Sequence, residues 1–459
     1  MTKSTQGRLG ETDSAPAALT DGTGTGLLTD HYELTMVSAA LRSGAAGRRA
    51  VFEMFARELP GGRRYGVVAG TGRFLRALEA FRFSADDIGF LRRNGIVDEN
   101  AARFLAAYQF RGDIWGYAEG DCYFPGSPVL VVEATFAEAV VLETLALSIF
   151  NHDCAVASAA SRMVTAAGGR PIIEMGSRRT HERAAVAAAR AAYLAGFATT
   201  SNLRAGYEFG VPTAGTSAHA FTMVHDDERQ AFTVQLEALG KGTTLLVDTY
   251  DVARAVRTAV ELAGQDLGAV RIDSGDLREV AHAVRAELDS LGATGTRIVI
   301  TGDLDEHSIA ALASAPVDGY GVGTALVTGS GVPTAALVYK LVAREDRAGA
   351  LVAVAKRSVG KPTIGGRKWA FRLLDAKGTA SGEVVSARPP ADLESAAVEP
   401  MAAGTGQASG RQAGSARRRR RVLLKQLVRS GEIVGDEPLT AARERHQRAL
   451  HELDRKSVV

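Results

Sequence analysis

Cysteine is scarce in this chain: its 459 residues include only two, Cys122 and Cys154. Two cysteines are too few for a disulfide scaffold or a four-cysteine zinc site, and neither lies in a metal-ligand spacing. Long apolar runs are lacking too, since no stretch of about 18 uninterrupted apolar residues occurs and the N-terminal residues have no signal-peptide core. These absences predict a protein of the reducing cytoplasm with no membrane span.

Charge of either sign is hardly in excess, because 54 Lys and Arg stand against 52 Asp and Glu. Such a balance gives little overall steering toward nucleic acid. The sequence also lacks a Walker phosphate loop, an HExxH helix and a Gly-x-Ser-x-Gly elbow, so zinc and serine hydrolase chemistries lose support. We therefore expect small-molecule partners and no nucleic acid.

The composition changes along the chain and suggests four regions. The first is rich in Gly, Ser and Thr and predicts a disordered arm. The second opens with a helix pattern that Thr29 or Asp30 could cap and Gly44 could end. A long helical stretch from residue 137 leads into the third. The expected regions are an arm (1–26), an N-terminal α/β domain (27–150), a β/α barrel (151–345) and a C-terminal segment (346–459).

The C-terminal segment contributes more than one kind of pattern. Residues 376–416 are rich in Ala, Gly and Ser and predict loosely ordered surface. The five-arginine run at 417–421 could be an anion or nucleic-acid patch, but we favour the solvated start of an amphipathic helix because interleaved aromatics are missing. Residues 442–453, ARERHQRALHEL, predict a terminal helix.

Seven short apolar or β-branched segments, most separated by helix-length stretches, make up the third region. Strands that alternate with helices indicate a parallel sheet, and seven in succession favour a barrel. We therefore predict an irregular seven-stranded β/α barrel, joined to an α/β domain built from the N-terminal region and C-terminal segments. The segments are PIIEMGSRR (171–179), FATTSN (197–202), GVPTAGT (210–216), TTLLVDTYD (243–251), AVRIDSGDL (269–277), RIVITGDLDE (297–306) and VDGYGVGTAL (317–326).

Glycine loops follow the last two of these segments. Thr301 and Gly302 end one, and Gly321, Gly323 and Thr324 end the other. Adjacent glycine-containing loops late in a β/α barrel expose backbone N–H groups that can cradle a phosphate. Each loop is a weak signal alone, and the pair on neighbouring strands is stronger.

Charged residues gather at other strand ends. Arg178 and Arg179 sit where a helix begins, a place that disfavours cations unless an anion is bound. Arg271 lies on a strand expected to be buried, so Asp273 or a ligand must neutralise it. Helix capping is the plainer account of any single Asp in IDSGDL or TGDLDE.

Histidine is the last candidate group. In GTSAHAF, His219 follows four small residues, Gly215 to Ala218, a setting that favours a working histidine over a core one. His152 reads as an ordinary hydrogen-bonding residue, and His181 fits either account.

Taken together, these segments resemble the nicotinate phosphoribosyltransferase family. The resemblance rests on TDHYELTM (29–36), FARELP (55–60), GSRRTHERAA (176–185), the block from ATTSN to GTSAHAF (198–221), VDTYD (247–251), RIDSGDL (271–277), TGDLDE (301–306), GVGTALVT (321–328), YKLV (339–342) and KRSVGKPTIGGRKWAFR (356–372). It covers nearly the whole chain from residue 27 to about residue 375, in family order.

The resemblance implies transfer of the 5-phosphoribosyl group from 5-phosphoribosyl 1-pyrophosphate to nicotinate, giving nicotinate mononucleotide and pyrophosphate in NAD salvage. It implies an ATP-coupled, ligase-type enzyme in which ATP phosphorylates His219, with Mg2+ carried by the polyphosphates. It also implies a homodimer whose active sites are shared between subunits.

The same resemblance assigns roles to residues. Tyr32, Thr216 and Arg271 would hold nicotinate, while Asp273 would act at the ribose or at a magnesium-bound pyrophosphate. The remaining group would bind 5-phosphoribosyl 1-pyrophosphate and comprises Arg178, Arg179, Gly302, Gly321, Gly323 and Thr324. No direct metal ligands can be named.

Some readings stay open at this point. Arg63 and Arg64 replace a usual glycine-rich turn and Gly365 a usual proline, and neither change is expected to touch the transfer chemistry. A related enzyme could use nicotinamide, which gives Arg271 no anion, or quinolinate, which needs further cations. A catalytically silent relative is the third possibility. Without the resemblance, only a phosphate-binding β/α barrel would be predicted.

Overall fold

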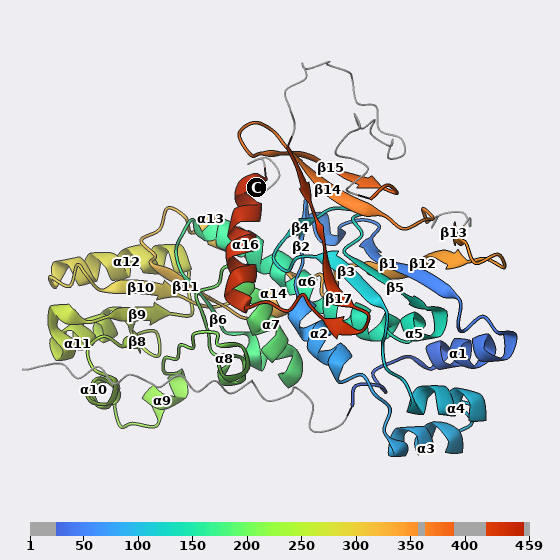
Figure 1. The fold of residues 1–459 in the computed structure, drawn as a ribbon. Coiled ribbons are helices and arrows are strands. Elements are labelled where there is room, and N and C mark those ends of the chain that lie inside the picture. The colour runs from blue at the N-terminus through green and yellow to red at the C-terminus, as the bar shows by residue number, and fades with distance from the viewer. Residues whose placement is uncertain (1–23, 357–362, 390–418, 454–459) are drawn as a thin grey trace, which may run out of the picture.

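The molecule is built on two large sheets that lie side by side, as Figure 1 shows. The structure is a computed structural model and describes residues 24–356, 363–389 and 419–453. Each sheet has its own apolar core, and a long helix runs from one core into the other. The candidate site is carried by the second sheet, while the first brings both ends of the described chain together.

The first sheet is antiparallel and combines strands from both ends of the chain. Its order is β13 (Leu351–Ala353), β12 (Leu337–Glu345), β1 (Arg49–Ala56), β5 (Leu130–Thr135), β3 (Asp113–Tyr117), β17 (Leu424–Arg429) and β18 (Glu432–Ile433). Phe52 on β1 stacks on Tyr339 of β12, with ring centroids 4.9 Å apart. The predicted union of N-terminal and C-terminal segments is therefore present in this sheet.

Helices cover this sheet. They are α1 (His31–Ser43), α2 (Thr71–Glu79), α3 (Ala85–Arg93), α4 (Glu99–Ala106) and α5 (Phe136–Val140). Helices α3, α4 and α5 have side-chain caps, whereas Asp30 at the start of α1 makes no capping hydrogen bond. Helix α1 begins after Asp30 and ends at Gly44, whose φ of 74° favours glycine. The helix predicted at the start of the second region is thus confirmed.

Helix α6 (Glu143–Ala167) joins the two halves, as the long helical stretch predicted. Residues Leu145 to Cys154 lie in the first core, and Val156 to Ala167 lie in the second. The run Phe136–Ala167 is long and apolar enough to cross a membrane by length and composition, but 67% of its most apolar stretch is buried inside the protein. It is the shared core helix of both halves.

The second sheet is parallel and curls into a half-barrel. Its order is β7 (Thr199–Thr200), β6 (Ile172–Glu174), β11 (Gly319–Val322), β10 (Arg297–Ile300), β9 (Ala269–Ile272) and β8 (Thr244–Leu246). The third of the seven predicted segments, 210–216, forms no full strand and has only an isolated bridge between Thr213 and Thr200. Pro212 lacks an N–H group for a ladder, which explains why no full strand forms there.

Helices connect the parallel strands and cover the sheet. They are α7 (Glu182–Leu194), α8 (Leu203–Phe209), α9 (His219–Met223), α10 (Glu228–Leu239), α11 (Val252–Ala263), α12 (Leu277–Ser290), α13 (Glu306–Ala311) and α14 (Thr324–Val327). Because strands alternate with helices, every strand runs in the same direction, and their carboxyl ends meet along one edge.

The C-terminal segment departs from two predictions. Strand β15 (Ala380–Ser386) pairs with β14 (Trp369–Leu374), so the loosely ordered surface expected over 376–416 is wrong at 380–386, and residues 390–416 lie outside the described part. Strand β16 (Arg419–Val422) replaces the predicted helix start, and Arg417 and Arg418 are not described. Arg421 pairs with Asp121 at 3.0 Å and with Glu452 at 2.8 Å, so this residue of the run joins β16 to α16 and to the turn at Asp121.

The two ends of the described chain are anchored. Helix α16 (Leu439–Glu452) confirms the predicted terminal helix, and its His446 bonds to Gly120 O at 3.0 Å. Thr25 is buried and donates to Ala77 O at 2.7 Å, so residues 24–26, predicted to belong to the arm, are part of the folded structure. Residues 1–23 lie outside the described part.

Candidate functional site

The carboxyl edge of the half-barrel collects most of the predicted site residues. Across the sheet, in the strand order β6, β11, β10, β9 and β8, each strand is followed in the chain by one residue of this edge. In that order these residues are Arg178, Gly323, Gly302, Asp273 and Asp248. In parallel β/α folds this edge is where ligands bind. The strand order therefore places arginines and glycine loops on one side and carboxylates on the other.

Arg271 lies on β9 and reaches the loop before α9. Its Nη1 donates a hydrogen bond to the hydroxyl of Thr216. Burial lowers the pKa of Arg271, and the nearby Asp273 and Asp248 oppose that shift. Within the described residues its buried Nε has no hydrogen-bond partner. A guanidinium with an unsatisfied N–H is suited to a ligand carboxylate.

Asp248 organises the turn after β8. Its Oδ2 accepts from the backbone N–H of Asp273 at 2.8 Å and from the Ser274 hydroxyl at 2.7 Å. Its Oδ1 lies 3.9 Å from Nε2 of His219 and, in the described structure, accepts no hydrogen bond. The side chain is only 2% exposed, so this carboxylate is fixed by the protein and faces the histidine.

His219 begins α9 and has oxygen groups near both ring nitrogens. Its Nδ1 is 3.1 Å from the hydroxyl of Thr249, and its Nε2 faces Asp248. The side chain is 39% exposed, so it remains open to a ligand. An imidazole held this way can keep a proton on one nitrogen while the other carries the lone pair for attack.

The glycine loops lie on neighbouring strands, as expected. Gly302 follows β10 with φ 128°, and a Cβ there would be 3.2 Å from Asp273 O. Gly323 precedes α14, and Thr324 is the first residue of that helix. Gly321 differs, because it lies inside β11 and a Cβ there would be 2.6 Å from Thr301 Cγ2. Its position lets the strand pack closely beneath the loops.

The two arginines after β6 are exposed at the same edge. Arg178 is close enough to Arg271 to contribute to lowering the pKa of that guanidinium. The Cγ of Arg179 is 3.9 Å from where a Cβ on Gly323 would be. The side chain of Arg179 therefore borders the loop that carries Thr324, and Arg178 lies near enough to Arg271 to affect it.

Glu174 supports this edge from below. It ends β6, is fully buried, and accepts hydrogen bonds from the Thr200 hydroxyl and the Gly176 N–H. Burial raises the pKa of this carboxyl above its ordinary value, and the two hydrogen bonds oppose the rise. The bonds fix the turns after β6 and β7, so Glu174 shapes the site without facing it.

Helix capping accounts for several other polar residues. Asp276 accepts from the backbone N–H groups of Arg278 at 3.2 Å and Glu279 at 3.1 Å. His181 caps α7 by accepting from Arg183 N at 3.2 Å. The capping account is therefore right for Asp276, while Asp248 and Asp273 have other contacts.

His152 behaves as predicted. Its Nδ1 is 2.7 Å from Asp153 Oδ1, beside the buried core of α6. This is an ordinary structural hydrogen bond, and His152 lies outside the candidate site.

Tyr32 is not part of this edge within one chain. It lies on α1, at the opposite end of the molecule from β8 and β9 in Figure 1. Its side chain is 47% exposed. One subunit by itself therefore does not bring Tyr32 to Arg271 and Thr216.

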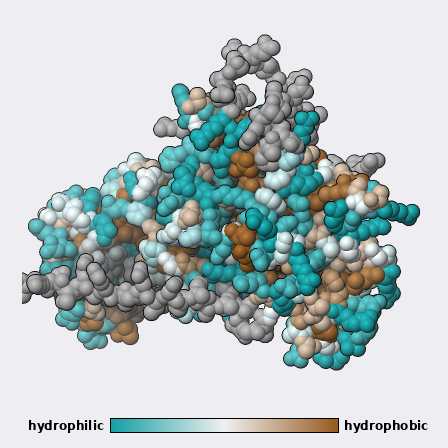
Figure 2. Space-filling model, viewed as in Figure 1, coloured by the Kyte–Doolittle hydropathy of each residue, from teal (hydrophilic) through white to brown (hydrophobic). Residues whose placement is uncertain are grey.

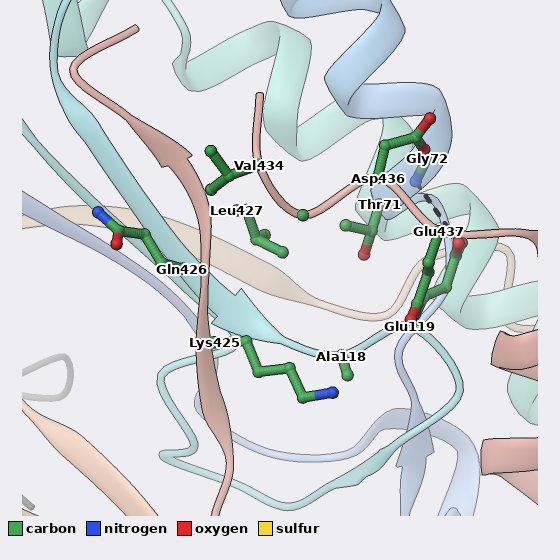
Figure 3. Close-up of a pocket in the computed structure, with 11 residues that line it drawn as sticks. Thr71, Gly72, Ala118, Glu119, Lys425, Gln426, Leu427, Val434, Asp436 and Glu437 are labelled. Carbon is green, nitrogen blue, oxygen red and sulfur yellow. Dashed lines mark hydrogen bonds between the residues drawn. The ribbon is translucent and has the colours of Figure 1, made fainter. Parts of the chain in front are cut away.

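Two cavities lie elsewhere, beside the segment 434–440. Figure 3 shows one of them, whose lining includes Thr71, Glu119, Lys425 and Asp436. Its volume is about 220 Å3. It adjoins a larger one of about 480 Å3 near α7 and α8. Neither contains a predicted site residue, and they belong to the junction between α2 and the C-terminal segment.

Metal-ligand clusters are not found among the described residues: no group of three or more His, Cys, Asp or Glu is arranged to hold an ion.

The sequence interpretation missed two functional candidates, Asp248 and Thr249. Their signal was available, because VDTYD places both directly after an apolar strand. The contact with His219, about 30 residues earlier in the chain, could not be read from that spacing.

The fold and site define a class of protein: a parallel β/α half-barrel whose carboxyl edge is suited to an anionic, phosphorylated ligand. Comparison with known families is specific. Residues 27–151 match the nicotinate phosphoribosyltransferase (NAPRTase) N-terminal domain, and residues 171–368 match the nicotinate phosphoribosyltransferase (NAPRTase) family. This chain belongs to the nicotinate phosphoribosyltransferase family.

Relatives and solved structures agree with that membership. The chain is 58% identical over 429 residues to nicotinate phosphoribosyltransferase pncB1 of Mycobacterium tuberculosis, covering 91% of this chain and 89% of that protein. It is 37% identical to the Bacillus subtilis nicotinate phosphoribosyltransferase, covering 76% and 73%. The crystal structure of human nicotinic acid phosphoribosyltransferase matches with a TM-score of 0.75 and 26% identity, covering 94% and 95%.

Proposed function

We propose that this protein transfers the 5-phosphoribosyl group of 5-phosphoribosyl 1-pyrophosphate to nicotinate, forming nicotinate mononucleotide and pyrophosphate for NAD salvage in the cytoplasm. The observation that carries the proposal is the Arg271–Thr216 pair, which lies beside Asp273 at the edge that also bears both glycine loops. The family membership and the 58% identity to a named enzyme support it.

Nicotinate is bound through its carboxylate and its ring. The carboxylate pairs with Arg271, whose Nε lacks a partner among the described groups, and Thr216 orients that guanidinium. Tyr32 of a second subunit stacks on the pyridine ring. Nicotinamide is neutral at this position and would leave Arg271 without a counter-ion, which favours nicotinate.

The sugar phosphate is held at the opposite end of the edge. The loops with Gly302, Gly323 and Thr324 bind the 5-phosphate, and Arg178 and Arg179 bind pyrophosphate oxygens. When the bond from ribose C1 to the pyrophosphate breaks, positive charge develops on the ribose and negative charge on the leaving group. Asp273 stabilises the first and the arginines the second.

ATP coupling is assigned to His219. Thr249 and Asp248 hold its imidazole at 3.1 Å and 3.9 Å, and the ring is partly exposed to ligand. Attack of the ring nitrogen on the γ-phosphorus of ATP breaks the bond to ADP and forms phosphohistidine. Later transfer of that phosphoryl group to water releases phosphate, and its hydrolysis drives nucleotide synthesis.

Magnesium fits the carboxylates of this edge. Asp248 Oδ1 is buried without a hydrogen-bond partner among the described residues, and Asp273 is exposed beside it. Carboxylate and phosphate oxygens are the ligands Mg2+ prefers, and a bound ion would neutralise polyphosphate charge. Asp248 and Asp273 would hold it, and their positions are fixed by the protein through Ser274 and Thr301.

A homodimer with shared sites explains where Tyr32 works. Apolar side chains are exposed near it, with Leu27 at 42% and Leu28 at 58%, and others surround the barrel edge, with Tyr207 at 71% and Val224 at 77%. Figure 2 shows such a hydrophobic patch over the region of α9 and α10. Packing one surface on the other would bury both and bring Tyr32 to the partner's Arg271.

The direct test supplies labelled nicotinate, nicotinamide or quinolinate with 5-phosphoribosyl 1-pyrophosphate, Mg2+ and ATP, and follows mononucleotide formation. The proposal expects nicotinate to react and the other two rings to be poor substrates. Reaction with nicotinamide or quinolinate alone would refute the substrate assignment. If no ring reacts although the protein binds 5-phosphoribosyl 1-pyrophosphate, a silent binding relative is the correct account.

A further inference from the structure

The loop that joins α14 to β12 has an unusual backbone. Gly329, Ser330 and Gly331 have φ values of 62°, 56° and 80°, and Ala336 has φ 57°. Non-glycine residues adopt positive φ at an energetic cost, so contacts from elsewhere must hold this conformation. The loop, residues 328–336, begins directly after the helix that carries Thr324.

Arg63 supplies those contacts from the N-terminal half of the chain. Its Nη2 donates to Gly329 O at 3.0 Å and to Val332 O at 2.8 Å, and its Nη1 donates to Thr334 O at 3.3 Å. The residue is 6% exposed. Within the described chain no carboxylate lies within ion-pair distance, so the buried guanidinium is stabilised mainly by hydrogen bonds to the carbonyl oxygens of this loop.

The surroundings of Arg63 fit the same loop. A Cβ on Gly61 would lie 2.5 Å from Cγ2 of Val332, so the turn before Arg63 packs directly on the loop. From the other side, Ser330 donates to Glu306 Oε2 at 2.7 Å. Glu306 is in turn paired with Arg162 of α6 at 2.8 Å. The loop is thus held between fixed groups from both halves of the molecule.

The loop is continuous with the phosphate-binding elements. Ser330 N donates to Ala325 O at 2.6 Å, so the loop folds back on α14. Gly329 N donates to Leu326 O at 3.0 Å, so the carbonyl that Arg63 binds follows α14 directly. A Cβ on Gly176 would be 2.3 Å from Cγ1 of Val327, so α14 also packs on the turn leading to Arg178.

We propose that Arg63 is a positioning residue for the phosphoribosyl pyrophosphate subsite. By holding the 328–336 loop, Arg63 fixes α14, and α14 places both Thr324 and the turn before Arg178. The nicotinate groups on β9 are separated from β11 by β10, so they are held independently of this loop. The inference rests on the proposed function, and it assigns work to an arginine that the sequence interpretation left outside the chemistry.

The test compares Arg63→Met and Arg63→Lys with Arg64→Met, a matched control whose side chain is exposed. Arg63→Met should raise the KM for 5-phosphoribosyl 1-pyrophosphate about tenfold or more while the KM for nicotinate stays within about twofold, because misplacement affects one substrate only. Arg63→Lys keeps the positive charge but lacks the several N–H donors of a guanidinium, so its KM for 5-phosphoribosyl 1-pyrophosphate should lie between those of the wild type and Arg63→Met. Added guanidinium ion should partly restore Arg63→Met, and Arg64→Met should match the wild type.

The proposal is overturned if folded Arg63→Met keeps its KM for 5-phosphoribosyl 1-pyrophosphate, or if the KM values for both substrates rise equally. If Arg63→Met does not fold, as judged by thermal melting, Ser330→Ala replaces it and must raise the same KM selectively. Equilibrium binding of labelled 5-phosphoribosyl 1-pyrophosphate separates this result from the proposed function. Wild-type binding without transfer to nicotinate refutes the function, while weakened binding in Arg63→Met still supports the positioning role.

Discussion

Asp248 Oδ1 lies 3.9 Å from Nε2 of His219, and the other oxygen of the same carboxylate accepts from the backbone N–H of Asp273 at 2.8 Å. One buried side chain therefore links the histidine assigned to ATP coupling with the carboxylate assigned to the ribose. The two roles predicted separately from the sequence are joined here by a residue that neither prediction included.

Asp248→Asn should reduce the ATP-stimulated rate about a hundredfold or more, because the amide removes the negative charge beside His219 while its oxygen can still accept from the turn at Asp273. Steady-state kinetics with and without ATP measure the loss. Asp276→Asn is the matched control in the next turn, since Asn caps a helix as well as Asp does. Equal loss in both variants would contradict a specific role for Asp248.

Arg271→Lys should raise the KM for nicotinate by about tenfold to a hundredfold with little change for 5-phosphoribosyl 1-pyrophosphate, because lysine cannot reproduce the guanidinium fork. Thr216→Val should raise the same constant less, since it removes only the acceptor that orients Arg271. Arg297→Lys, at the exposed start of β10, serves as the control. A rise confined to 5-phosphoribosyl 1-pyrophosphate would show that Arg271 has been assigned to the wrong substrate.

The shared-site dimer predicts complementation between two inactive variants. Tyr32→Ala and Arg271→Ala should each lose activity, and a mixture of their reassociated subunits should recover about a quarter of it, because half of the dimers contain one intact site of two. Sedimentation confirms the dimer in each sample. Mixtures as inactive as their components would place Tyr32 outside the partner's site.

Glu33 gives a pH-dependent contribution to stability. It is fully buried and accepts from Thr144 N at 3.0 Å, and burial raises its pKa to about 7. The folded state then holds a proton more tightly than the unfolded state, so this contribution falls as pH rises from about 4.5 to 7. In the wild type, the free energy of unfolding should decrease by a few kcal/mol over this pH range, on the order of 1.4 kcal/mol per pKa unit. In Glu33→Gln this decrease should be absent. Urea titrations at pH 5, 6 and 7 measure the difference.

His446 should act in the opposite direction. Burial lowers its pKa to about 4, while its ring bonds to Gly120 O and Ser161 Oγ at 3.0 and 2.9 Å. The folded state resists protonation, so stability is lost as pH falls from about 6.5 toward 4. His446→Gln should flatten that loss, and His451→Gln, an exposed histidine on the same helix, should leave it unchanged. A loss that persists in His446→Gln would contradict this assignment.

Local patterns predicted much of the architecture because they depend on near neighbours. The helix from His31 to Ser43, the alternation of strands and helices, and the glycine loops after β10 and β11 all follow from spacing and capping. The segment 210–216, predicted as one of seven strands, does not form a full strand because Pro212 has no N–H group to donate. This is a local effect that the apolar pattern does not report.

Long-range pairing explains the remaining differences. The described part of the arginine run, residues 419–421, lies in strand β16, which pairs with β14, and Arg421 pairs with Asp121 and Glu452. All of these partners are distant in the sequence. The link between Asp248 and His219 and the contacts of Arg63 with Gly329 also cross large sequence separations. Such contacts form only when the sheets assemble, so the sequence indicated the groups but not their partners.

The most direct measurement follows nicotinate mononucleotide formed from labelled nicotinate and 5-phosphoribosyl 1-pyrophosphate with Mg2+, with and without ATP, in wild type and His219→Ala. The account predicts that ATP stimulates the wild type and that His219→Ala keeps a basal rate without stimulation. Equal stimulation of His219→Ala would contradict the phosphohistidine, and a wild type that makes no nicotinate mononucleotide would contradict the proposed function itself.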